Sequence, residues 1–160
     1  MILQKLYWHI FAILKLIFYK ILYGANFSMP FSSSFRERFN VAIKDGSVCI
    51  GKNVFFNNDC SITAVGSSIN IGDNTILGEN VKMYCHNHCY HEGSRLIKEQ
   101  GYTSAPIKIG ENCWITSNVV ILKGVTIGDN CVIGAGCIIY KNVESGKVLL
   151  NKQELVCLNN

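Results

Sequence analysis

Three of the four histidines in this 160-residue sequence fall within one short segment, Tyr84-Cys85-His86-Asn87-His88-Cys89-Tyr90-His91. An imidazole ionises near neutral pH, so a histidine can accept the proton of a hydroxyl group that attacks an acyl donor. His86 and His88 are two residues apart, and alternation along an extended strand would place both on one face. The segment therefore predicts a general base with a second imidazole beside it.

The same segment also contains Cys85 and Cys89, and zinc sites are built from cysteine and histidine side chains. The usual zinc frame needs a second, distant pair of ligands, and none follows here. A γ-class carbonic anhydrase would need three histidines spread over adjacent structural repeats. We therefore predict no metal at this segment, and stoichiometric zinc in the purified protein would contradict this prediction.

The sequence around the histidine segment follows a six-residue repeat. Its clearest run has isoleucine at every sixth position: Ile109, Ile115, Ile121, Ile127, Ile133 and Ile139. A small or β-branched residue follows each isoleucine four positions later, and glycine, asparagine and aspartate crowd the positions between. Shorter runs with the same spacing begin at Ile50 and Ile71. A period of six matches neither an α-helix nor simple strand alternation.

This period fits a parallel β-helix whose coil has three short, flat faces. Each face needs one inward aliphatic residue, and each corner needs a small inward residue and a turn that glycine, asparagine or aspartate can make. Stacked coils bury a continuous apolar column, which stabilises the fold by roughly 1.5–3 kcal/mol per fully buried side chain. Four cysteines occupy the small inward position and are expected to be free thiols there: Cys60, Cys113, Cys131 and Cys137.

Residues 1–23 are strongly apolar and contain neither glycine nor proline, so we expect a helix. Lys5, Lys15 and Lys20 divide the stretch, which disfavours a membrane span. The helix either packs on the body of the protein or on a partner subunit, or it lies on a bilayer surface. The predicted organisation is a helix and connector over 1–38, a β-helix over 39–146 with an excursion loop over 84–105, and a tail over 147–160.

The charge and composition of the chain limit the kinds of molecule that it is expected to bind. The formal charge is +4, only 16% of residues are charged, and no dense Lys/Arg block occurs, so nucleic acid is not an expected partner. The hydrophobic fraction of 49% is ample for a core. No signal peptide with a small-residue cleavage site is recognisable. We expect a protein of the reducing cytoplasm, with peripheral contact at the inner face of the membrane through residues 1–23 as the alternative for the helix.

The hexads resemble those of the hexapeptide-repeat acyltransferases over about residues 48–145. The stretch Ser104–Ile115, followed by Ile121–Asn130, is similar to the maltose/galactoside O-acetyltransferase branch and to relatives in capsule, O-antigen and exopolysaccharide clusters. The resemblance implies an all-β fold, a left-handed parallel β-helix with an N-terminal α-helix and one excursion loop. It also implies acetyl-CoA as co-substrate, a sugar or glycan acceptor, and a homotrimer with shared sites.

The resemblance assigns roles residue by residue. Alignment of the preceding coil puts His88 on the family's catalytic histidine, with His86 as the alternative base or a substrate contact. Six further residues match family positions: acceptor contacts at Asn57 and Trp114, and acetyl-CoA contacts at Ser117, Ala135, Tyr140 and Lys141. Asn58 competes with Asn57 for the acceptor role, and Lys141 could equally be a solvated surface lysine.

Two departures from the family pattern keep other functions open. Thr116 stands where the family usually has glycine, and the common C-terminal Gly-x-Pro-Ala pattern is absent. A non-catalytic scaffold that keeps the solenoid is therefore one alternative, which calorimetry with acetyl-CoA would separate. The other alternative is an N-acetyltransferase of an amino sugar, which only product analysis distinguishes from an O-acetyltransferase.

Overall fold

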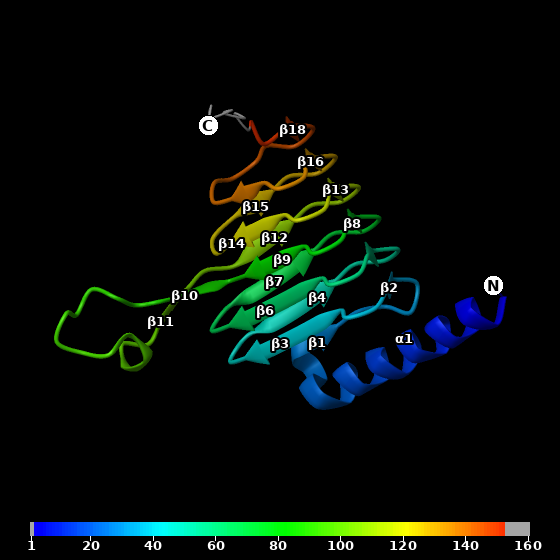
Figure 1. The fold of residues 1–160 in the computed structure, drawn as a ribbon, viewed down its shortest axis with the longest axis horizontal. Helices are drawn as coiled ribbons and strands as arrows, with labels where there is room; N and C mark the ends of the chain where they lie inside the picture. Colours follow the sequence, from blue (N-terminus) through cyan, green and yellow to red (C-terminus); the bar gives the residue numbers. More distant parts are fainter. Residues whose placement is uncertain (1, 153–160) are drawn as a thin grey trace, which may run out of the picture.

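The computed structural model of the protein describes residues 2–152, with side chains described from residue 10 onward. One α-helix precedes a column of stacked coils, from which a single hairpin projects sideways (Figure 1). The coils are built from three parallel sheets, which we call A, B and C in the order in which the chain visits them. The predicted fold class, an all-β parallel β-helix with an N-terminal helix and one excursion loop, is confirmed.

The elements have the following bounds. The helix α1 spans Ile2–Tyr23, and one 3₁₀ turn, η1, spans Gly24–Asn26. Sheet A contains β1 (Phe27–Ser28), β4 (Ser47–Ile50), β7 (Ser68–Ile71), β12 (Ile107–Ile109) and β15 (Thr126–Ile127). Sheet B contains β2 (Ser34–Phe35), β5 (Phe55–Phe56), β8 (Ile76–Leu77), β13 (Trp114–Ile115), β16 (Val132–Ile133) and β18 (Val148–Leu149). Sheet C contains β3 (Asn40–Lys44), β6 (Ser61–Val65), β9 (Lys82–Tyr84), β14 (Val120–Leu122) and β17 (Ile138–Ile139). The excursion contains the antiparallel strands β10 (His86–His88) and β11 (Tyr102–Ser104) and the 3₁₀ turn η2 (Ile97–Glu99).

The predicted inward residues form the core. All six isoleucines of the main run are buried, as are their counterparts in the earlier runs. Parallel register stacks them directly: Ile115 lies between Leu77 and Ile133 in sheet B, and Ile121 lies between Met83 and Ile139 in sheet C. The apolar residues of each face therefore touch their equivalents in the coils above and below, so the core is a continuous column.

The polar half of the repeat builds the corners. Asparagines adopt the left-handed conformation there, which this residue tolerates better than most: Asn53, Asn74, Asn80, Asn112, Asn118 and Asn130. Their side chains bond along the column, and Asn112 Nδ2 donates to Asn130 Oδ1 at 2.8 Å. Glycine follows several of the inward isoleucines for a steric reason: a Cβ on Gly72 would lie 2.6 Å from the carbonyl carbon of Gly110 in the next coil.

The solenoid extends beyond the range 39–146 at both ends. Strands β1 and β2 already pair with β4 and β5, and β18 pairs with β16. In the first coil aromatic and sulfur-containing side chains take the inward positions, among them Phe27, Met29 and Phe35, all buried. The segment 24–38 is therefore structural core as well as connector. Its coil lacks the isoleucine spacing, which is why the repeat did not reveal it.

Helix α1 covers the open end of the first coil (Figure 1). Leu16 and Tyr19 are buried, and the Tyr19 ring lies 5.7 Å from that of Phe27 and 6.3 Å from that of Phe39, centroid to centroid. The Lys15 amino group donates to the Phe39 carbonyl oxygen. One face of the helix thus packs on the body of the protein. Within the described residues, no helix combines the length and apolarity needed to cross a bilayer.

The cysteines give a prediction about reactivity. Every cysteine in the described part of the chain is a free thiol, and burial raises the pKa of Cys60 to about 11. Because the thiolate is the reactive form, iodoacetamide at pH 8 should alkylate the exposed Cys49 rapidly. Five thiols should react only after unfolding in urea, as peptide mass spectrometry can establish: Cys60, Cys85, Cys113, Cys131 and Cys137. Rapid alkylation of these five in the native protein would contradict the inward register. Cys157 lies outside the described residues.

Candidate active site

The histidine segment forms one strand of the projecting hairpin. Strand β10 leaves the column after β9, at the corner between sheets C and A, and pairs with β11 so that His86 lies opposite Ser104 and His88 opposite Tyr102. The far end of the excursion is held by its own polar contacts. Glu92 Oε2 pairs with Arg95 Nη1 at 3.0 Å, and Gln100 Nε2 donates to the Glu92 carbonyl at 2.9 Å.

Both histidines of the strand lie against the same aromatic ring. The Tyr102 ring is 5.3 Å from the His86 ring and 4.6 Å from the His88 ring, centroid to centroid. His86 is half-buried and His88 is exposed. His91, the third histidine of the segment, instead contacts Tyr90, with ring centroids 4.3 Å apart. The hairpin therefore presents two neighbouring imidazoles, one sheltered and one open to solvent.

The two imidazoles differ in environment. Burial, and secondarily the proximity of His88, lower the pKa of His86 below its ordinary value. His86 Nδ1 is buried and has no hydrogen-bond partner among the described residues. The lowered pKa favours the neutral form of the His86 imidazole, and its Nδ1 can form a hydrogen bond to a bound molecule.

Removing His88 should change the titration of His86. Two protonated imidazoles repel each other, so the His88→Gln protein should protonate His86 more readily and show a higher His86 pKa than the wild type. The value should stay below that of an unperturbed histidine because the burial remains. NMR titration of the His86 Cε1 proton measures this shift. The His91→Gln protein is the matched control and should leave the His86 midpoint unchanged, while a fall in the His88→Gln protein would contradict the geometry.

A second group of predicted residues lies at the corner between sheets B and C. Asn57 follows β5, Ser117 follows β13, and the exposed Ala135 follows β16, so the three line this corner along the column. The Asn57 Oδ1 accepts the Asn58 backbone N–H at 2.9 Å, and the Ser117 Oγ accepts the Glu79 backbone N–H at 3.2 Å.

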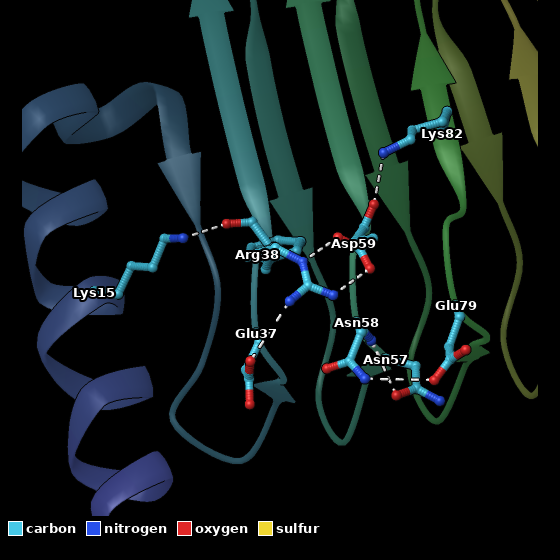
Figure 2. A network of polar contacts seen from close by, with 9 residues as sticks. Lys15, Glu37, Arg38, Asn57, Asn58, Asp59, Glu79 and Lys82 are labelled. Carbon is cyan, nitrogen blue, oxygen red and sulfur yellow. Dashed lines mark hydrogen bonds and ion pairs between the residues drawn. The ribbon is translucent and has the colours of Figure 1, made fainter.

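Charged side chains surround the lower part of this B/C corner. Figure 2 shows Asn58 reaching towards Glu79, with Nδ2 to Oε1 at 3.4 Å. One coil further down, Arg38 and Asp59 form a two-point ion pair whose Nη2–Oδ2 distance is 2.7 Å. Arg38 and Asp59 occupy the left-handed corner position that asparagines fill in the later coils. The Asn58 side chain therefore bonds a carboxylate, whereas the Asn57 amide nitrogen has no such partner within residues 10–152.

The remaining predicted residues lie on sheet B and at the C/A corner. Trp114 is 54% exposed on the outer face of sheet B, paired in register with Ile76 and Val132. Tyr140 and Lys141 follow β17 at the C/A corner, two coils above the start of the hairpin, or about 10 Å along the column. The Lys141 amino group lies 5.6 Å from the Tyr140 ring centroid.

Apart from Trp114 on sheet B, the predicted site residues thus occupy two corners of one chain. The histidines, Tyr140 and Lys141 share the C/A corner, and Asn57, Ser117 and Ala135 share the B/C corner. One face of the column, about 15 Å of extended chain, separates the two corners. A single chain does not bring the two groups together.

The structure adds Tyr102 and Glu79 to the residues around the site. Tyr102 contacts both histidines, and Glu79 bonds both Asn58 and Ser117. The repeat predicts neither residue, because the position of Tyr102 depends on the hairpin register and that of Glu79 on the stacking of coils.

Cys85 does not join the histidines: it is buried, and its Sγ accepts the Val65 backbone N–H at 3.2 Å. Among the described residues no group of three or more potential metal ligands is close enough to hold an ion.

Known proteins are similar to this chain in both architecture and sequence. Residues 106–141 match the family model described as bacterial transferase hexapeptide (six repeats). The galactoside O-acetyltransferase of Escherichia coli strain K12 is 42% identical over 80 residues, which make up 50% of this chain and 38% of that protein. The structure of a maltose O-acetyltransferase from Clostridium difficile 630 is 32% identical, with 82% of this chain and 69% of that chain covered and a TM-score of 0.61. The chain belongs to the hexapeptide-repeat acetyltransferases.

Another solved hexapeptide-repeat acetyltransferase, a galactoside acetyltransferase in complex with coenzyme A, is 34% identical, with 75% of this chain and 60% of that chain covered and a TM-score of 0.59. The matched segment spans only 38% to 42% of the length of the curated relatives. The family model matches residues 106–141, so the hexapeptide-repeat match runs from β12 to β17 and the histidine hairpin precedes it.

Proposed function

We propose that the protein is an acetyl-CoA-dependent O-acetyltransferase that acts on a sugar hydroxyl. The observation that carries the proposal is the pair of imidazoles held against Tyr102 on an arm beside the column. The names of the relatives support the substrate class, since galactosides and maltose are both sugars and one relative is in complex with coenzyme A. The motif similarity to capsule and O-antigen enzymes favours a role in surface-polysaccharide biosynthesis, in the cytoplasm where acetyl-CoA is supplied.

In the proposed reaction His88 is the general base. Its imidazole takes the proton of the acceptor hydroxyl as the oxygen attacks the thioester carbonyl of acetyl-CoA. A new C–O bond forms, the C–S bond breaks, and the coenzyme A thiolate leaves and is protonated. A backbone N–H, for which that of Ser117 is our candidate, stabilises the negative charge on the carbonyl oxygen. Transfer is direct, so catalysis rests mainly on holding acceptor and donor together.

We assign the acceptor contacts to polar atoms that have no hydrogen-bond partner among the described residues. The Asn57 Oδ1 accepts its neighbour's N–H, so the Asn57 amide nitrogen is the group left to donate to a sugar oxygen. His86 is neutral and has an unsatisfied ring nitrogen, which can bond a second hydroxyl. The exposed ring of Trp114 offers an apolar surface for the face of a sugar. These contacts fit an uncharged glycan hydroxyl acceptor.

Acetyl-CoA would extend along the column between the two corners. Ala135 is small and exposed, so the backbone beside it can approach the pantetheine arm, and the half-buried Ser117 lies one coil below on the same corner. Tyr140 is 67% exposed and could stack on the nucleotide base, while the Lys141 ammonium would offset phosphate charge. The residues present therefore fit the donor, although the C-terminal family pattern is absent.

The two-corner arrangement supports a homotrimer. Three triangular columns related by a closed three-fold axis can each turn a C/A corner towards the B/C corner of the next subunit. Each of the three grooves would then receive its base from one subunit and Asn57, Ser117 and Ala135 from the neighbour. The trimer is part of the proposal because one chain alone leaves the site in two halves.

Incubation of the purified protein with radiolabelled acetyl-CoA and a panel of galactosides, maltose, amino sugars and bacterial glycans tests the function. We expect label in a sugar ester that hydroxylamine releases. Label in a hydroxylamine-stable amide would instead identify an N-acetyltransferase. Absence of both transfer and acetyl-CoA binding in calorimetry would favour a non-catalytic scaffold and contradict the proposal.

A further inference from the structure

The face of α1 that points away from the solenoid is apolar and uncovered. Leu16 and Tyr19 lie on the packed face. Large apolar side chains elsewhere on the helix are between 37% and 78% exposed, among them Ile10, Ile13, Leu14, Ile17, Phe18, Ile21 and Leu22. A helix that is apolar on all sides is normally buried on all sides, and an apolar patch of this extent on a soluble surface marks an interaction site. The outer face of α1 therefore has no packing partner among the described residues.

The charges of the helix are all of one sign. Three lysines and no acidic residue occur in the range 2–23. Lys15 is turned towards the solenoid, and Lys20 lies 4.6 Å from the ring centroid of Phe31, which is itself 65% exposed. Lysine stems that lie along apolar surface while their ammonium groups stay in water are typical of interfacial helices.

A second observation lies at the C-terminal end of the helix. Lys20 and Lys52 both line an open hollow of 310 Å³ between the helix and the A/B corner. Asp73 also lines it, and its Oδ1 is occupied by the Lys52 backbone N–H at 2.7 Å. Two lysines and one aspartate thus line a concave surface next to exposed apolar side chains. A net positive charge beside an apolar surface is the chemistry that an anionic lipid headgroup and its acyl chains require.

We propose that α1 docks the protein flat on an anionic lipid bilayer, with the first coil facing the membrane. A second copy of the helix is a poorer occupant of the same face, because pairing two such helices brings lysines together without any carboxylate of α1 to neutralise them. Figure 1 shows α1 lying across one end of the column, so the coils rise away from its outer face. The hairpin leaves the third strand of sheet C, about 10 Å above the first coil, and the histidines would therefore lie close to the membrane surface.

Co-sedimentation of the full-length protein with lipid vesicles tests the proposal. Vesicles of phosphatidylglycerol and phosphatidylcholine should bind the wild type at least about tenfold more tightly than pure phosphatidylcholine, and high salt should weaken the binding. The double variant Ile17→Gln/Ile21→Gln should bind anionic vesicles at least about tenfold more weakly, since both side chains leave the apolar phase. Ile138→Gln is the matched control, because Ile138 is 61% exposed on the solenoid, and should bind like the wild type.

A further variant and the molar mass distinguish the outcomes. Lys20→Gln should weaken binding to anionic vesicles and leave binding to neutral vesicles unchanged, which tests the charge separately from the apolar face. Failure of the wild type to bind anionic vesicles, or equal binding by the double variant, would overturn the proposal. So would a change in the solution molar mass of the double variant, which would assign the face to contacts between copies. Acetyl transfer should persist in the double variant, so this test is independent of the proposed function.

Discussion

Replacing His88 by alanine is expected to lower the rate of acetyl transfer by about 10²–10⁴-fold. His88 is the exposed member of the pair against Tyr102, and alanine removes the group that accepts the hydroxyl proton. The loss should appear in kcat and in kcat/KM alike, because the base acts in the transition state and adds little to acetyl-CoA binding. Steady-state kinetics with a responsive glycan acceptor, together with calorimetry of acetyl-CoA, measure both quantities.

His91→Ala is the matched control, since His91 lies in the same excursion but contacts Tyr90. It should transfer acetyl at close to the wild-type rate. His86→Ala should cause a smaller loss that falls mainly on the KM of the acceptor, because we assign His86 a substrate contact. Near-normal transfer by His88→Ala would refute the assignment, and a large loss in His86→Ala with normal transfer by His88→Ala would reverse the two roles.

Replacing Ile115 by alanine is expected to lower the free energy of unfolding by about 2–5 kcal/mol. Ile115 is fully buried and lies between Leu77 and Ile133 in adjacent coils of sheet B. Alanine there opens a cavity that a stacked column cannot close without moving the neighbouring coils. Urea unfolding followed by circular dichroism measures the loss.

Ile138→Ala provides the comparison for that variant. Ile138 is 61% exposed and directly precedes the buried Ile139, so the same chemical change on the outer face should alter the unfolding free energy by no more than about 0.5 kcal/mol. Equal losses in the two variants would contradict the assignment of inward and outward positions that the repeat predicts.

The repeat predicts most of the fold because its geometry leaves little choice. One inward aliphatic residue is needed on each face, and the six-residue spacing therefore predicts the buried isoleucines of the main run and four of the five buried cysteines. The first coil escaped this reasoning, since Phe27, Phe35 and Phe39 fill its interior in place of isoleucine. Aromatic side chains span more of the interior each, so the regular spacing is not required where the helix closes the column.

The site was predictable in part. The two-residue spacing of His86 and His88 on a strand indicated neighbouring imidazoles, and Tyr102 contacts both rings. Tyr102 itself could not be predicted, because its place opposite His88 depends on the register of a hairpin with a long connection. The placement of Asn57 and His88 at different corners was not predicted, since it depends on where the excursion leaves the coil.

The surroundings of the N-terminal helix could not be predicted from its sequence. Composition alone left packing on the body and contact with a bilayer as alternatives. One face of the helix packs on the solenoid through the buried Leu16 and Tyr19. The opposite face, with Ile17 and Ile21, is exposed to solvent. Both alternatives can therefore hold for the same helix, on opposite faces.

Complementation between two inactive variants tests most directly whether His88 of one subunit works with the B/C corner of the next. Ala135→Trp should block that corner without disturbing the core, because Ala135 is exposed. Each variant alone should be inactive, and co-expressed His88→Ala and Ala135→Trp chains should regain activity at about a quarter of their sites, where an intact histidine faces an intact corner. Mixed assemblies that contain both chains but recover no acetyl transfer would contradict the account.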